Sequence, residues 1–286
     1  MTEHNPSGQN PSGDAGQDPD AGREPPAGID TSVPQTARIW NHWLGGKDNY
    51  AADREVGDNM LKVMPDLVPI ARASRYFLAR AVRYLAGEVG IRQFLDVGTG
   101  LPTVDNTHEV AQRVAPESRI VYVDNDPLVL AHARALLTSS PKGVTDYVDA
   151  DARDPEAILT GAAETLDFSR PVALMLLGVL GHITDDDDAK SVTDRLLAGL
   201  APGSHLVVDD GTNVIRGEEH EEAARIWNES AKPPYRLRTP EEIAGFFDGL
   251  ELVEPGVVSC PLWRPDHSPF EAPVEVDIFC AVGRKP

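Results

Sequence analysis

The chain has 286 residues and a mass of 30.9 kDa, enough for one large domain or for a domain with a substantial cap. Hydrophobic residues make up 41% and charged residues 25%, an ordinary globular composition that excludes a wholly disordered or fibrous protein. The formal net charge is −20, which disfavours a nucleic-acid partner because such binding needs Lys and Arg to neutralise phosphates.

The sequence contains no apolar run of about 20 residues that could span a bilayer, and no basic N-terminal segment followed by an apolar one. We therefore expect neither a membrane span nor a secretory signal. Cys260 and Cys280 are the only cysteines, too few for a disulfide framework. Reduced thiols and a cytoplasmic location are the expectation.

Three regions are predicted from the change in composition along the chain. Residues 1–34 are rich in Pro, Gly and acidic residues and are typical of a disordered tail. Residues 35–90 combine tryptophans, paired glycines and a helical apolar period over residues 66–86, and should form a helical cap. The arginines of that helix are expected on its solvated face; they are Arg72, Arg75, Arg80 and Arg83. The third region, residues 91–286, alternates between strands and helices.

The third region is expected to form a doubly wound α/β fold with a mostly parallel, seven-stranded sheet. Strands are predicted at residues 91–98, 119–124, 145–151, 171–180, 204–210, 250–258 and 274–283. Helices are predicted at residues 106–115, 127–137, 184–200, 218–230 and 239–249, with Asn106, Thr184 and Thr239 as their caps where a polar residue precedes the helix. No helical pattern joins the last two strands, so the last strand should be antiparallel.

A glycine-rich turn follows the first strand of this region. Asp96 ends the strand, and Gly98 and Gly100 let the backbone turn sharply and approach a ligand. A nicotinamide-binding turn would have a third glycine where Thr103 stands, and would seat a pyrophosphate on the following helix. A carboxylate in this position disfavours a pyrophosphate and suits a ligand with a cationic amino group.

Acidic residues also end the next two strands. Asp124 closes the second strand, beside Asn125, where a carboxylate can accept both hydrogen bonds of a ribose diol. Asp151 closes the third strand and is followed by Ala152, a position suited to the amine and a ring nitrogen of adenine. Each acid alone is as readily a helix cap, but three in succession after a glycine turn indicate a nucleoside site.

These segments resemble the class I S-adenosylmethionine-dependent methyltransferases, and more closely the actinobacterial DUF574 family of methyltransferase-like proteins. The closer resemblance is carried by ARIWNHWLGGKDNYAADR, FLDVGTGLPTVDNTHEVAQ, YVDNDPLVLAHARALL, DADARDP, LVEPGVV and WRP. It implies a Rossmann-like methyltransferase sheet with S-adenosylmethionine as cofactor. The site residues that it implies for this cofactor are Asp96, Gly98, Gly100, Asp124, Asn125, Asp151, Ala152, Leu177 and Arg75.

The remaining roles are less specific. The resemblance places Leu177 and the following residues where they face the substrate and the sulfonium, which makes His182 a candidate general base, although packing on the adenosyl group or turn capping is the favoured interpretation. Arg72 or Arg75 could pair with the cofactor carboxylate.

No metal site is expected. The run Asp185–Asp188 lacks the spacing of a calcium loop and complements a helix dipole. Asp209 and Asp210 close a strand and could bind a cation, but solvent-facing strand-end acids are the favoured interpretation.

The cap is expected to fold over the ligand pocket. Trp40, Trp43, Trp227 and Trp263 all lie outside the predicted strands, in segments expected near the carboxyl ends of the strands and the ligand crevice. They could shield the ligand or pack a helical cap. Lys47 and Tyr50 could reach the ligand. The sequence therefore favours a methyltransferase acting on a small molecule. The alternatives are a non-catalytic S-adenosylmethionine sensor and, less favoured, an NAD-dependent oxidoreductase; the oligomeric state stays open.

Overall fold

The structure is a computed structural model that describes residue 25 and residues 29–136, 139–266 and 272–286. Most of the predicted disordered tail, residues 1–34, lies outside the described residues. Within the described part of the chain, no helix is both long and apolar enough to cross a membrane.

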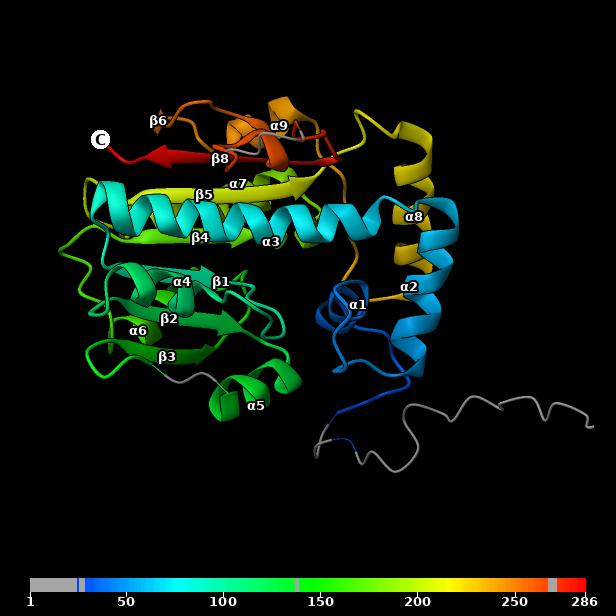
Figure 1. The fold of residues 1–286 in the computed structure, drawn as a ribbon, viewed down its shortest axis with the longest axis horizontal. Coiled ribbons are helices and arrows are strands. Elements are labelled where there is room, and N and C mark those ends of the chain that lie inside the picture. The colour runs from blue at the N-terminus through cyan, green and yellow to red at the C-terminus, as the bar shows by residue number, and fades with distance from the viewer. Residues whose placement is uncertain (1–24, 26–28, 137–138, 267–271) are drawn as a thin grey trace, which may run out of the picture.

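A single eight-stranded sheet forms the centre of the protein (Figure 1), in the order β3-β2-β1-β4-β5-β8-β6 with β7 also paired to β8. Strands β1 to β5 are parallel, and β8 is antiparallel to β5, β6 and β7. The strands are β1 (Gln93–Val97), β2 (Arg119–Asp124), β3 (Val144–Asp149), β4 (Ala173–Leu177), β5 (His205–Gly211), β6 (Glu251–Leu252), β7 (Val258–Ser259) and β8 (Ile278–Arg284). The predicted mostly parallel α/β sheet with an antiparallel last strand is confirmed.

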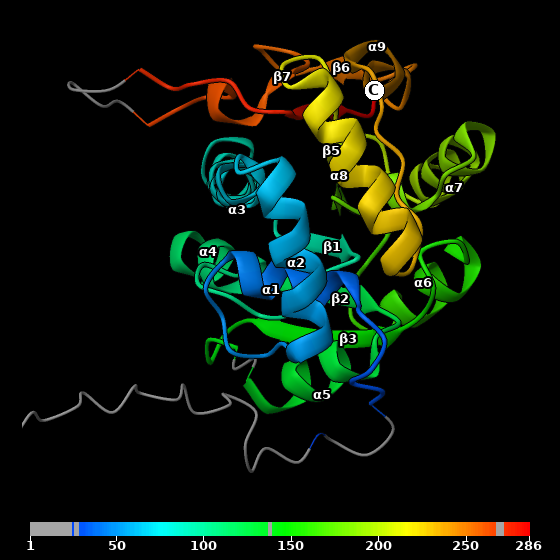
Figure 2. The same cartoon turned by 90° about the vertical axis from the view of Figure 1, so that its right-hand side faces the viewer.

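Helices cover both faces of the sheet (Figures 1 and 2). Their bounds are α3 (Leu67–Tyr84), α4 (Thr107–Val114), α5 (Pro127–Leu136), α6 (Pro155–Ala162), α7 (Asp186–Ala198) and α9 (Pro240–Gly245). Alternate side chains of each strand enter opposite cores because the side-chain period of a strand is two. Phe94 of β1 packs in the core under α3, whereas Leu95 packs in the core under α6 and α7.

Two predicted elements differ in detail. The strand expected at residues 250–258 is divided into β6 and β7, because the turn through Pro255 and Gly256 separates them and Gly256 has φ 87°. The helix expected to be capped by Thr184 has Asp185 as its N-cap, whose side chain accepts a hydrogen bond from the amide of Asp188. By contrast, the capping boxes that begin with Asn106 and Thr239 are present.

Three further helices form a layer across the carboxyl ends of the parallel strands (Figure 1). They are α1 (Thr36–Trp43), α2 (Ala51–Val63) and α8 (Gly217–Ser230). Arg38 of α1 ties this layer together: its Nε lies 3.2 Å from Asp53 Oδ1 of α2, and it donates to the carbonyls of Asp30 and Val33. Both charged groups of this pair are buried. This buried ion pair therefore fixes α1 against α2 and against the segment that precedes α1.

A second buried arginine holds the loop that follows β4. Arg238 Nη1 lies 2.9 Å from Asp210 Oδ2, and both side chains are fully buried. The same guanidinium donates to the carbonyls of Leu180 and Ile183 and pairs with Asp186 at the start of α7. The position of this loop therefore depends on one charge in the interior.

Asp209, the neighbour of Asp210, is also fully buried, so the expectation that these two acids face solvent is wrong. Ser74 of α3 donates to Asp209 Oδ2 at 2.6 Å, while Oδ1 has no hydrogen-bond partner. The acids are enclosed because β8, far along the chain, pairs with β5 directly beside them. Burial raises the pKa of Asp209 to about 7.

Replacing Arg238 should destabilise the protein strongly, because Asp210 would remain buried without its cation. We expect R238A to lower the free energy of unfolding by about 3–5 kcal/mol, measured by chemical denaturation. R236A is the matched control, since the Arg236 pairs with Asp186 and Glu242 are partly exposed and should contribute no more than about 1 kcal/mol. Equal losses in the two variants would contradict this account.

The raised pKa of Asp209 should make stability fall as pH rises. The folded state keeps a proton that the unfolded carboxyl, with a pKa of about 3.9, releases, so stability is lost between pH ~4 and pH ~7. D209N cannot release this proton. The Tm of D209N minus the Tm of the native chain should therefore increase from about pH 5 to about pH 8. D248N replaces an exposed acid and is the control. If the Tm difference of D209N changes with pH no more than the Tm difference of D248N, the prediction is contradicted.

Candidate functional site

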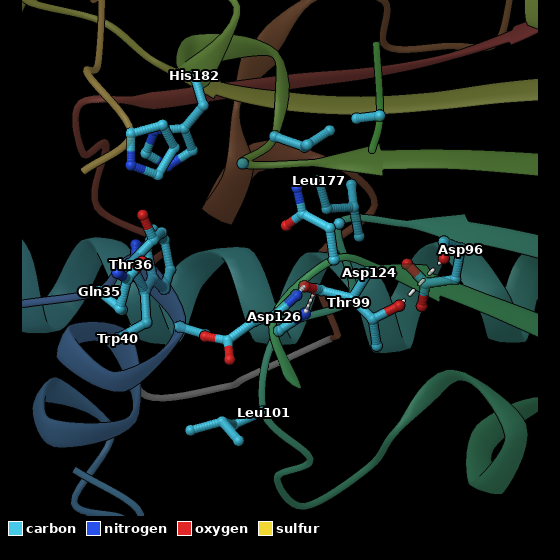
Figure 3. A pocket seen from close by; sticks show the side chains of 18 of the residues that line it. Gln35, Thr36, Trp40, Asp96, Thr99, Leu101, Asp124, Asp126, Leu177 and His182 are labelled. Atoms are coloured by element: carbon cyan, nitrogen blue, oxygen red, sulfur yellow. Dashed lines mark hydrogen bonds between the residues drawn. The ribbon is translucent and has the colours of Figure 1, made fainter. Parts of the chain in front are cut away.

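A cavity of about 470 Å³ lies at the carboxyl ends of β1, β2, β3 and β4 and is covered by α1 (Figure 3). All ten site residues predicted from the sequence line it: Arg75, Asp96, Gly98, Gly100, Asp124, Asn125, Asp151, Ala152, Leu177 and His182. Ligands of open α/β sheets bind in this crevice, where the strand order reverses between β1 and β4. The volume falls within the range of small-molecule and cofactor pockets.

The glycine turn after β1 forms one wall of the cavity. Gly98 and Gly100 have φ values of 74° and 66°, in the left-handed region that favours glycine. A Cβ at Gly98 would lie 2.7 Å from the Cβ of Val179, so a side chain there would displace the loop after β4. The amide of Gly100 donates to Asp124 Oδ2 at 2.9 Å, which joins the turn to the end of β2.

Asp96 and Arg75 lie together in the interior end of the cavity. Thr107 donates to Asp96 Oδ2 at 2.6 Å, and burial raises the pKa of Asp96 to about 6, an effect that Thr107 and Arg75 oppose. Arg75 Nη2 donates to the carbonyl of Asp105 at 3.3 Å, and its Nε is buried without a partner. Arg75 is therefore not on a solvated helix face as predicted, whereas Arg72 is exposed and does not line the cavity.

The acids after β2 and β3 differ in their surroundings. Asp124 Oδ1 accepts from the amide of Asp126 at 2.9 Å, and burial raises the pKa of Asp124. Strand β3 ends at Asp149, so Asp151 lies in the following loop and not at the strand end as predicted. Arg153 donates to both oxygens of Asp151, at 2.9 and 2.6 Å, and lowers its pKa.

His182 is a neutral side chain with one unused nitrogen. Its Nδ1 lies 3.0 Å from the carbonyl oxygen of Pro234, which can only accept, so Nδ1 carries the proton and Nε2 carries a lone pair. Nε2 is buried without a partner. Burial lowers the pKa of His182 to about 4. The ring packs against Trp227 and Tyr235 at centroid distances of 5.7 and 4.9 Å.

The four tryptophans have three different surroundings. Trp40 lines the main cavity, while Trp43 and Trp227 line a smaller adjoining hollow. Trp263 packs against Phe77 of α3 at a centroid distance of 5.3 Å and is fully buried, away from both. The expectation that all four lie near the ligand crevice is therefore wrong for Trp263.

Lys47 and Tyr50 were candidates for contact with the ligand, but neither residue lines the cavity. Tyr50 packs in a small core with Leu101, Leu128 and Val129.

Several cavity residues were not identified from the sequence. Gln35 and Thr36 at the start of α1, and Lys232 and Pro233 after α8, line the cavity together. An isolated parallel bridge joins Gln35 to Lys232, almost 200 positions later in the chain. No local pattern signals such a contact, although Gln35 begins the block predicted to cover the pocket.

Among the described residues, no three His, Cys, Asp or Glu side chains are grouped so that they could hold a metal ion. The acids of the run Asp185–Asp188 serve other purposes: Asp185 caps α7, and Asp186 pairs with Arg236 and Arg238.

Comparisons with known proteins place this chain. No curated protein matches it. A DUF574 family protein from Streptomyces avermitilis MA-4680 is 47% identical, covering 90% of this chain and 99% of that one, with a TM-score of 0.86. A candidate methyltransferase from Thermobifida fusca YX is 46% identical, covering 91% and 98%, with a TM-score of 0.83. The family model described as S-adenosyl methyltransferase matches residues 22–286, and the chain belongs to that family.

Proposed function

We propose that the cavity binds S-adenosylmethionine and that the protein transfers its methyl group to a small-molecule acceptor. The observation that carries this proposal is the convergence of Asp96, Asp124 and Asp151 on one cavity in a chain of this family. Asp96 and Asp124 come from β1 and β2 and Asp151 from the loop after β3, and the three carboxylates offer separate contacts for the amino acid, the ribose and the base.

The residues at the interior end fit the methionine part of the cofactor. Asp96 suits a cationic amino group, since such a charge close to a buried carboxyl with a raised pKa would favour its ionised form. Arg75 Nε is a buried donor without a partner, which suits the cofactor carboxylate. An amino acid bound here would satisfy both groups at once.

The nucleoside would lie along the ends of β2 and β3. Each oxygen of Asp124 accepts one backbone hydrogen bond and retains a lone pair for a ribose hydroxyl. Asp151 and Ala152 would hold the adenine edge, with Asn125 donating to Asp151 Oδ2 at 3.4 Å. Leu177, at the end of β4, would pack against the adenosyl group from the opposite side.

When bound, the cofactor supplies a methyl group already activated by the sulfonium. The protein then contributes proximity, in-line orientation and exclusion of water, and α1 covers the cavity as such a role requires. His182, with its pKa lowered to about 4, is a poor proton acceptor at neutral pH. We infer that it binds the substrate or packs against it and does not act as a strong base.

The comparisons give no support to the two alternative functions, a non-catalytic sensor and an NAD-dependent oxidoreductase. The cofactor pocket alone does not require catalysis, so methyl transfer itself is part of the proposal. A cytoplasmic location and a small-molecule acceptor are likewise proposed, the latter because the chain is strongly acidic.

Removing the Asp124 carboxylate should abolish tight cofactor binding. Two charge-assisted hydrogen bonds to the ribose, each worth about 1.5–3 kcal/mol, would be lost in D124A, so its Kd for S-adenosylmethionine should rise at least about 100-fold. D124N, which keeps one acceptor oxygen, should show a smaller loss. Titration calorimetry with S-adenosylmethionine, S-adenosylhomocysteine and NAD measures these affinities.

The control is D149A. Asp149 lies beside Asp124 in the β2–β3 register but is exposed and does not line the cavity. An equal loss of affinity in D149A, or tight binding of NAD to the native protein, would refute the assignment.

A further inference from the structure

A smaller hollow of about 40 Å³ adjoins the main cavity on the side away from Asp96. The two spaces share Trp40 and His182 as walls. Figure 3 shows His182, Thr36 and Trp40 at one end of the main cavity and Asp96 at the other. The remaining walls of this aromatic hollow include Trp43, Trp227, Tyr235, His220 and Ile278.

The side-chain polar atoms of Trp43, Trp227 and Tyr235, and Nδ1 of His220, are engaged with the protein itself. Trp227 Nε1 donates to the carbonyl of Pro233 at 2.8 Å, and Trp43 Nε1 approaches the carbonyl of Gly57 at 3.4 Å. Tyr235 donates to Asp210 Oδ1 at 3.1 Å and accepts from the amide of Gly211 at 3.0 Å. His220 Nδ1 lies 2.6 Å from the carbonyl oxygen of Thr212. These side chains therefore present their apolar faces to the hollow.

His182 Nε2 is the exception where the two spaces meet. Because Nδ1 donates to Pro234, Nε2 can only accept a hydrogen bond, and it is buried with none. An unsatisfied acceptor in the interior costs free energy unless a ligand supplies the donor. A ligand with an N–H or O–H group at this point would satisfy the nitrogen.

Gly178 lines the main cavity beside Trp40. A Cβ on Gly178 would meet nothing closer than Asp209 Oδ1 at 3.9 Å and Trp40 Cζ2 at 4.0 Å. Two ionisable groups near this space are accounted for, because Asp210 is paired with Arg238 and His182 is neutral. Asp209 Oδ1 is buried without a hydrogen-bond partner and is a second acceptor beside Gly178.

We propose that the methyl acceptor is an aromatic compound with an N–H or O–H donor, bound where Trp40 and His182 separate the main cavity from the aromatic hollow. Its donor bonds to His182 Nε2, its ring packs against Trp40, and a ring substituent enters the hollow, which is too small for the ring itself. This inference rests on the proposed function, since the cofactor fills the opposite end of the cavity.

Three probes that share one ring test the proposal. 4-Methylphenol and 4-methylaniline carry a donor and are uncharged at neutral pH, while the oxygen of 4-methylanisole carries a methyl group in place of the donor hydrogen. Binding to the native protein saturated with S-adenosylhomocysteine would be followed by calorimetry and tryptophan fluorescence. The two donors should bind about tenfold more tightly than the anisole, the expected effect of one buried hydrogen bond.

Two variants and a control separate the contacts. H182A should bind all three probes equally, because the acceptor nitrogen is gone, and W40L should weaken all three together. The control is Y76A, which removes an exposed aromatic side chain of α3 that lines neither space, and it should leave the affinities unchanged. The comparison of probes on the native protein needs no variant, so it stands even if H182A does not fold.

The outcomes distinguish the proposed aromatic acceptor from the proposed function itself. Equal binding of the three probes to the native protein, a preference that persists in H182A, or no probe binding while S-adenosylhomocysteine binds would overturn the aromatic acceptor and leave the proposed function intact. Failure of S-adenosylhomocysteine itself to bind would remove the proposed function and the inference with it.

Discussion

Buried carboxyl groups at the carboxyl edge of the sheet are the constraint on which the rest of the structure depends. Asp96, Asp209 and Asp210 are each buried, and burial raises the pKa of all three. A group of this kind needs partners within the protein, since water no longer solvates it. Thr107 and Ser74 supply hydroxyl donors, and Arg238 supplies a cation. Each partner comes from a different element, so satisfying the acids also draws α3, α4 and the segment after α8 to the strand ends.

The parts of the fold that sequence reasoning identified are those with local signals. The strand of hydrophobic residues before Asp96, the glycines of the following turn and the capping boxes at Asn106 and Thr239 all depend on neighbours within a few positions. Parallel strands end at one edge of the sheet, so acids at successive strand ends could be predicted to converge. The structure brings them to one cavity even though Asp151 lies beyond the end of β3.

The parts that were missed depend on distant partners or on a weak signal. Nothing near Asp209 indicates that β8 and α3 will enclose it, and a strand-end acid is ordinarily exposed. Trp263 packs on α3, almost 200 residues earlier in the chain. Helix α6 was not predicted because it is short. Asp154 followed by Pro155 is nevertheless a recognisable helix start, and the Asp154 side chain accepts a hydrogen bond from the amide of Ala157.

The two ends of the cavity also differ in whether they are built from local segments or from segments far apart in the sequence. The proposed cofactor end is built from strand ends and the turns that follow them, held by contacts such as that of Gly100 with Asp124. The proposed acceptor end is assembled from α1, the loop after β4 and the segment after α8, and it is held by the Gln35–Lys232 bridge and by Arg238. The contacts of the two proposed ends therefore come largely from different segments, but Arg238 couples them, because it holds the loop after β4 and also pairs with Asp210 at the end of β5. Under the proposed function, substitutions of residues that line only the acceptor end should alter the choice of acceptor, whereas substitutions at the strand ends should weaken binding of the cofactor.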